Sequence, residues 1–133
     1  MKLYLFVGVL LFLGCTSEVK TEDIKFIEGY WVISEATAPN GEKRIFNAAV
    51  EVDFFELEGL KGFRKKVTPL LDDSFNSSND LVGFTISFDK EYCVITYTRK
   101  QHSWKEEILL INDEKLKLKD SRGVVFEYKR FVL

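Results

Sequence analysis

The alternation of apolar and polar residues in the second half of the chain constrains the fold most strongly. Within residues 82–88, valine, isoleucine and two phenylalanines alternate with glycine, threonine and serine. A period of two residues is typical of a strand with one buried face. Further strand-like runs follow at residues 92–98, 104–111, 115–119 and 124–131. Turns of about three to five residues separate them, so neighbouring strands must be antiparallel, because parallel neighbours need much longer crossovers.

The first half of the chain also predicts strands, although its pattern is less regular. Residues 30–36, 50–57 and 63–68 are rich in β-branched, aromatic and other apolar residues, and residues 72–80 are expected to form a polar loop. The chain has 12 Phe, 5 Tyr and 2 Trp but only 2 Pro, a composition that favours β-structure over irregular structure. One short helical turn is expected at residues 24–28. A meander of about eight strands leaves exposed edges unless it closes, so we expect an all-β, antiparallel up-and-down barrel.

The N-terminus has the layout of an export signal. Lys2 precedes an apolar run at residues 3–13, and the sequence becomes polar directly after Gly14 and Cys15. A run of about 11 apolar residues fits the core of a signal peptide, and it is shorter than the roughly 20 residues that span a bilayer. The alternative is a short buried strand or helix that happens to end in cysteine.

The residues around Cys15, Leu-Phe-Leu-Gly-Cys, resemble a lipobox, the motif at which bacterial lipoproteins are cleaved and lipidated. This resemblance implies that residues 1–14 are a signal peptide, residues 15–23 a lipidated tether and residues 24–133 the folded domain. It also implies diacylglyceryl and palmitate-type acyl chains on Cys15. The expected location is the bacterial cell envelope, at the outer membrane, and the expected partner is the membrane, reached through the N-terminal lipid.

Composition excludes several classes for the mature chain. After removal of 14 of the 133 residues, 119 remain, enough for one domain with its own core. Cys93 is then unpaired, because Cys15 carries the lipid. Eighteen basic residues (19 less Lys2) face 21 acidic residues, and the two signs are interspersed. We therefore expect a monomer that binds no nucleic acid.

Two short motifs mark the ends of the domain. Gly29 and Trp31 open the first strand, and Tyr128 and Arg130 close the last. These motifs resemble those of small lipocalin-like lipoproteins. The resemblance implies that Trp31 plugs one end of the barrel beside Gly29, with Arg130 packed across the indole. It also implies an interior that accepts a small apolar ligand such as a lipid. The residues expected to face that interior are Phe54, Phe84, Phe88, Ile95, Tyr97, Phe126 and Tyr128.

The sequence shows no catalytic constellation, no metal site and no cofactor motif. His102 is the sole histidine and is expected in a polar turn. Cys93 would become a nucleophile only if His102 returned beside it across a hairpin; its parity favours a buried thiol instead. Glu106 brings a carboxylate to one face of its strand, either inside a cavity or, as we expect, at the barrel rim.

Two functions therefore remain open, and a third is disfavoured. The first is a membrane-anchored binding protein that holds a small apolar ligand in its barrel. The second is a packed barrel that acts as an interaction or structural module of the envelope. A hydrolase is disfavoured because no nucleophile–base pair is evident, so we expect no enzymatic activity. An empty cavity would support the first function, and a close-packed interior would support the second.

Overall fold

The computed structural model describes residues 19–47, 51–77 and 80–132, which form a β-barrel preceded by one short helix. The 3-10 helix η1 spans Thr21–Ile27, so it includes the last three residues of the segment expected to be a tether. The strands are β1 (Gly29–Thr37), β2 (Lys43–Ile45), β3 (Val52–Glu58), β4 (Lys61–Pro69), β5 (Phe75–Ser77), β6 (Val82–Asp89), β7 (Tyr92–Arg99), β8 (His102–Ile111), β9 (Lys115–Lys119) and β10 (Val125–Arg130). Cys15 and the signal segment lie outside the described residues. No helix in the described ranges is long and apolar enough to cross a membrane.

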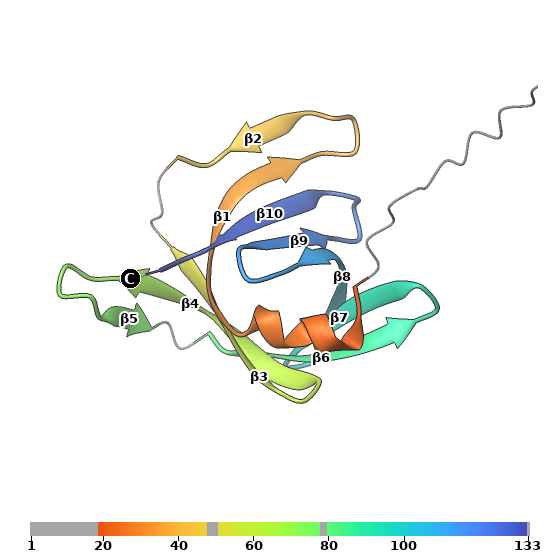
Figure 1. The fold of residues 1–133 in the computed structure, drawn as a ribbon, viewed down its shortest axis with the longest axis horizontal. Coiled ribbons are helices and arrows are strands. Elements are labelled where there is room, and N and C mark those ends of the chain that lie inside the picture. Colours follow the sequence, from red (N-terminus) through yellow and green to blue (C-terminus); the bar gives the residue numbers. More distant parts are fainter. Residues whose placement is uncertain (1–18, 48–50, 78–79, 133) are drawn as a thin grey trace, which may run out of the picture.

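Eight of the strands close into a ring. Their order is β1-β3-β4-β6-β7-β8-β9-β10, and β10 pairs with β1 to complete the barrel. Every pairing is antiparallel, and the ring is visible in Figure 1 with η1 lying across it. The predicted all-β, up-and-down barrel is therefore confirmed.

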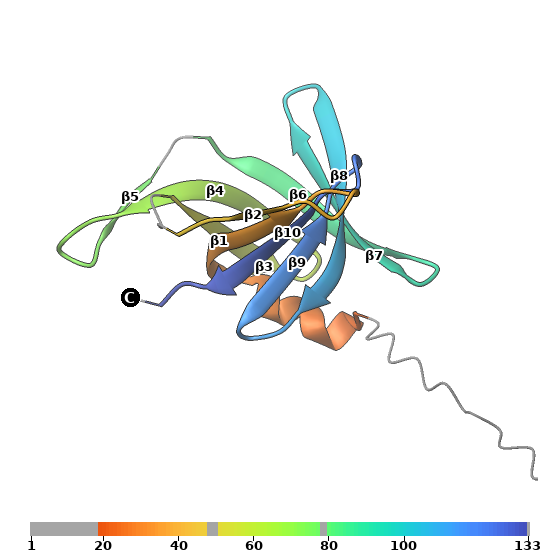
Figure 2. The same cartoon turned by 90° about the horizontal axis from the view of Figure 1, so that it is seen from above.

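Two short strands lie outside the ring and were not predicted. β2 pairs with the second half of β1, and β5 pairs with the second half of β4. The expected loop at residues 72–80 is therefore partly a strand. β4 contacts β6 only from Lys61 to Arg64 and contacts β5 from Val67 to Pro69. The added strand supplies hydrogen-bond partners for the part of β4 that has left the barrel. Figure 2 shows the resulting β4–β5 hairpin projecting from the ring.

The barrel interior is a packed apolar core. Side chains from η1 and from seven strands contribute to it, and many are fully buried. Its members are Ile24, Ile27, Trp31, Phe55, Phe84, Ile86, Cys93, Ile95, Tyr97, Ile108, Ile111, Leu116, Leu118 and Tyr128. These side chains fill the body of the barrel in the part of the chain that the structure describes.

One end of the barrel is closed by η1, Trp31 and Arg130. Trp31 is fully buried, and its indole nitrogen donates a hydrogen bond to the Ile27 carbonyl oxygen at 2.8 Å. The Arg130 guanidinium lies 3.9 Å from the centre of the indole ring. It also donates hydrogen bonds to the carbonyl oxygens of Phe26, Glu28 and Asp113. The stacking that the lipocalin-like resemblance implies is thus present, and Arg130 ties the last strand to η1.

Gly29 is required at this end for two separate reasons. Its φ is +124°, a conformation that residues with a Cβ rarely adopt. A Cβ built on Gly29 would lie 2.5 Å from Nη1 of Arg130, far inside van der Waals contact. A side chain here would therefore push Arg130 away from Trp31.

We predict that Gly29→Ala lowers the free energy of unfolding by about 3 kcal/mol, through backbone strain and the collision with Arg130. Gly41→Ala is the matched control: Gly41 has a φ of +91° but no atom within 4 Å of a built Cβ. It should cost only about 1 kcal/mol. Urea denaturation of both variants measures the difference, and equal losses would show that Arg130 plays no part.

Candidate functional site

The most unusual feature of the interior is a largely buried arginine, Arg64, whose side chain is 17% exposed. Arg64 lies on β4 directly opposite Phe55 of β3 and shares its inward face. Its Nε donates a hydrogen bond to Asp53 at 3.2 Å. Its Nη1 donates to the Tyr97 hydroxyl at 2.9 Å and to Glu106 at 3.3 Å, and its Nη2 donates to the Tyr128 hydroxyl at 3.1 Å. The guanidinium also lies over the Phe55 ring, 4.8 Å from its centre.

Two carboxylates balance this arginine. Among the described residues, Asp53 and Glu106 are the two charged residues that are buried. Arg64, between them, is partly exposed. The expectation that Glu106 lies at the rim is wrong: it points inward and pairs with Arg64. An isolated carboxylate in such a place would be strongly destabilising, and the ion pair offsets that cost. Lys66 lies 3.5 Å from Asp53 and adds a second, exposed positive charge.

Arg64 and its four partners form one hydrogen-bonded group, which we call the Arg64 cluster (Asp53, Arg64, Tyr97, Glu106 and Tyr128). Burial raises the pKa of Tyr97 and Tyr128 above that of a free phenol, so both stay neutral. Burial alone would lower the pKa of Arg64. Its interactions with Tyr97, Asp53, Tyr128 and Glu106 outweigh this effect and raise the pKa well above its usual value. Arg64 is therefore a permanent cation.

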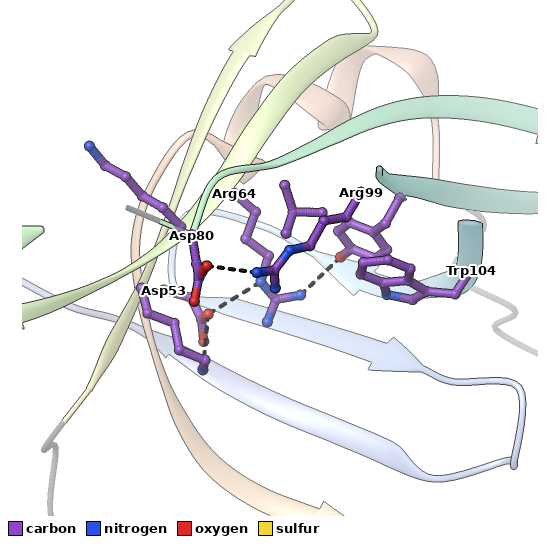
Figure 3. Close-up of a pocket in the computed structure, with 9 residues that line it drawn as sticks. Asp53, Arg64, Asp80, Arg99 and Trp104 are labelled. Carbon is purple, nitrogen blue, oxygen red and sulfur yellow. Dashed lines mark hydrogen bonds and ion pairs between the residues drawn. The ribbon is translucent and has the colours of Figure 1, made fainter. Parts of the chain in front are cut away.

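A pocket of about 280 Å³ opens above the Arg64 cluster. We call it the mouth pocket. Its lining combines ionic and aromatic side chains and comprises Asp53, Arg64, Lys65, Lys66, Asp80, Val82, Tyr97, Arg99 and Trp104. Figure 3 shows Arg99 and Trp104 on one side and Asp53 and Asp80 on the other, with Arg64 between them. The pocket lies near the β7–β8 turn, at the end of the barrel away from η1.

Two contacts shape the walls of the mouth pocket. Trp104 stacks on Tyr97, with ring centres 5.5 Å apart and an angle of 21° between the planes. Arg99 pairs with Asp80 at 2.7 Å, and both side chains are exposed. The floor is therefore a buried, hydrogen-bonded cation, whereas the rim is an exposed ion pair beside an indole.

The residues with catalytic potential do not meet. Cys93 lies near the start of β7, whereas His102 pairs with Arg99 at the far end of that strand. Burial raises the pKa of the Cys93 thiol to about 11, so it is protonated at neutral pH and a poor nucleophile. No group of three or more metal-ligating His, Cys, Asp or Glu residues occurs in the described parts of the chain.

Five of the seven predicted interior residues face the core. Phe84, Ile95, Tyr97 and Tyr128 are buried, and Phe126 packs against them while partly exposed. Tyr97 alone of these lines the mouth pocket. Whether any of them contacts a ligand stays a prediction.

The other two predicted interior residues lie elsewhere. Phe54 is on the outer face of β3, where it packs against Tyr30 with ring centres 4.7 Å apart, because its neighbour Phe55 faces inward. Phe88 has the right parity but lies at the end of β6, where it is exposed. The inward placement expected for Phe54 and the burial expected for Phe88 are therefore wrong.

Sequence reasoning did not identify Asp53, Arg64 or Arg99 as site residues. In β4, Phe63 and Val67 share the parity opposite to Arg64, a pattern that favours placing Arg64 outside. The outer face of β3 and β4 is itself apolar, with Phe54 and Phe63 in contact, so the apolar residues of β4 do not mark its inward face. The available signal was Glu106, since an inward carboxylate needs a cationic partner.

Three comparisons with known proteins give one similar structure. No family model and no curated protein sequence matches this chain. Among solved structures, a lipocalin-like protein from Bacteroides uniformis ATCC 8492 is similar at 10% identity and a TM-score of 0.49. The match covers 80% of this chain and 99% of that one. The closed barrel of this chain rests on its own strand pairings, from β1–β3 round to β10–β1.

We predict that Arg64→Met destabilises the protein by about 3–5 kcal/mol at pH 8, because it leaves Asp53 and Glu106 buried without a cation. Arg122→Met is the control, since Arg122 is exposed and pairs with Asp120 in a turn. Denaturant unfolding of both variants measures this; a loss in Arg64→Met no larger than that in Arg122→Met would contradict the ion-pair role.

Proposed function

We propose that this protein is a membrane-anchored binding protein of the bacterial cell envelope that holds one small ligand in its mouth pocket. The observation that carries the proposal is the mouth pocket itself, in which an aromatic wall stands over a buried cation. Ligand sites are typically concave, mostly apolar and furnished with a few convergent polar groups. A volume of about 280 Å³ suits one small molecule.

The packed core changes where such a ligand would lie. Phe84 and Ile95 were expected to line a cavity, but they are buried in the close-packed core. A ligand therefore occupies the mouth and not the body of the barrel. Because the floor is the Arg64 cluster, an amphipathic ligand suits the pocket better than a purely apolar one.

The position of the pocket agrees with an N-terminal anchor. The tether would join the barrel at η1, which lies at the end closed by Trp31. The mouth pocket lies at the other end, beside the β7–β8 turn. A lipid on Cys15 would thus hold the barrel with its pocket on the side away from the point of attachment. Several buried methylenes at about 0.8 kcal/mol each make such an anchor stable.

The packed core also favours a second function, an interaction module of the envelope with no small ligand. A filled barrel of this kind is rigid and needs no ligand to complete it. The two functions differ in whether the mouth pocket is occupied when the protein is purified from its host.

We predict that Cys15→Ser releases the protein from the membrane fraction, because the acyl chains need the cysteine sulfur. Fractionation of cells that express either form, followed by immunoblotting, measures this. Circular dichroism of the released variant should remain β-rich. A variant that stays with the membrane pellet would contradict the lipid anchor.

We predict that native mass spectrometry of the purified protein detects one bound small molecule, and that Val82→Trp abolishes it by filling the mouth pocket. Val94→Trp, on the outward face of β7, is the control and should retain the ligand. Both variants should keep the melting temperature within a few degrees. If the unmodified protein carries no ligand in any preparation, the interaction module is the correct function.

A further inference from the structure

The charges of the mouth pocket indicate the chemistry of its ligand. Four basic side chains line it, Arg64, Lys65, Lys66 and Arg99, against two acidic ones, Asp53 and Asp80. Glu106 lies behind Arg64 and adds a third negative charge. Lys66 also pairs with Glu51 at 3.7 Å, and the Lys65 ammonium lies over the outward-facing rings of Phe54 and Phe63. Arg64 and Arg99 are therefore the two cations that can meet one acidic group inside the pocket.

The two ion pairs of the pocket differ sharply in their exposure. The side chains of Arg64 and Asp53 are 17% and 8% exposed, so separating them would leave buried, unpaired charges. The side chains of Arg99 and Asp80 are 47% and 69% exposed. Exposed pairs of this kind contribute little to stability and exchange partners readily. An incoming anion would therefore take Arg99 from Asp80 and leave the Arg64 cluster intact.

Arg64 retains one donor for such an anion. A guanidinium has five N–H groups, and four of those on Arg64 are used by Asp53, Tyr97, Glu106 and Tyr128. The fifth, on Nη2, has no partner among the residues that the structure describes. Because Arg64 lines the mouth pocket, this N–H is available at its floor.

Trp104 supplies an apolar surface beside these donors. One face of its indole is stacked on Tyr97, and the side chain is still 42% exposed. An exposed tryptophan next to an ionic rim suits a ligand with an apolar or aromatic body.

We propose that the mouth pocket binds a small amphipathic monoanion, whose acidic group contacts Arg99 and the free N–H of Arg64 and whose apolar body lies on Trp104. This inference rests on the proposed binding function and narrows it to one ligand class. Arg99 is the residue that selects the anion, and Asp80 is its competitor in the unliganded protein. A carboxylate or a sulfonate on a compact apolar body has the required chemistry.

Two probes of similar size and different charge test the proposal. The anionic probe is 1-anilinonaphthalene-8-sulfonate, and the neutral probe is N-phenyl-1-naphthylamine. Both are titrated into the folded Cys15→Ser protein, and binding is followed by probe fluorescence. The proposal predicts that the anionic probe binds at least about tenfold more tightly, and that raising the salt concentration weakens this probe selectively.

Two variants should change the affinity for the anionic probe in opposite directions. Arg99→Gln should weaken it about tenfold, and Asp80→Asn should strengthen it about twofold to threefold by freeing Arg99. The neutral probe should change by less than about twofold in both. Arg122→Gln, which removes an exposed arginine outside the pocket, is the control and should have no effect. If the Arg99–Asp80 pair had a purely structural role, both substitutions would change the affinity for the anionic probe in the same direction.

The outcomes separate this inference from the proposed function. If both probes bind the mouth pocket equally and neither variant matters, the ligand is not an anion and the binding function stands. If neither probe binds and no ligand co-purifies, both proposals are overturned. If Arg99→Gln and Asp80→Asn both weaken the anionic probe, the partner exchange at Arg99 is wrong.

Discussion

The guanidinium of Arg64 links five of the eight barrel strands. Arg64 itself lies on β4, and its hydrogen-bond partners lie on β3, β7, β8 and β10. Arg64 and its partners stabilise one another, because two buried carboxylates and two buried phenols surround one cation. Directional contacts across the barrel fix the relative positions of distant strands more closely than apolar packing does. The apolar core below then fills the space that this cluster defines.

Arg64 and Arg130 each donate several hydrogen bonds at one end of the barrel, but they differ in the acceptors that they use. Arg130 donates to three backbone carbonyl oxygens and covers Trp31, so its donors are committed to closing one end. Arg64 donates only to side chains and lies beneath an opening. The acceptors of Arg130 are backbone groups of η1, of the residue after it and of the β8–β9 turn, whereas the side-chain acceptors of Arg64 leave one of its N–H groups for a ligand. The end with Arg64 is therefore suited to binding, and the end with Arg130 is suited to stability.

Much of the fold could be predicted from the sequence, because the strands of the second half each have one apolar face. The same reasoning failed where both faces are apolar. Phe54 and Phe55 are adjacent, so one of them had to lie outside, and the choice depends on what covers the outer face. Tyr30 packs against Phe54 there and stacks on Phe75 of β5, a strand that the sequence did not reveal. The candidate site was missed for the same reason. Arg64 lies on the inward face with Phe55, and this face could not be identified from the sequence while both faces are apolar.

The closed and the open end of the barrel constrain each other. A ligand that reached deep into the interior would have to displace Phe55, Phe84 or Ile95 from close packing, at a cost of several kcal/mol for each side chain. The Arg64 cluster lies directly above this core and marks the depth at which the mouth pocket ends. The packing that stabilises this small barrel therefore limits any ligand to the size of the mouth. Within that limit, selection must come from charge and from the indole of Trp104, because shape alone discriminates poorly in a shallow site.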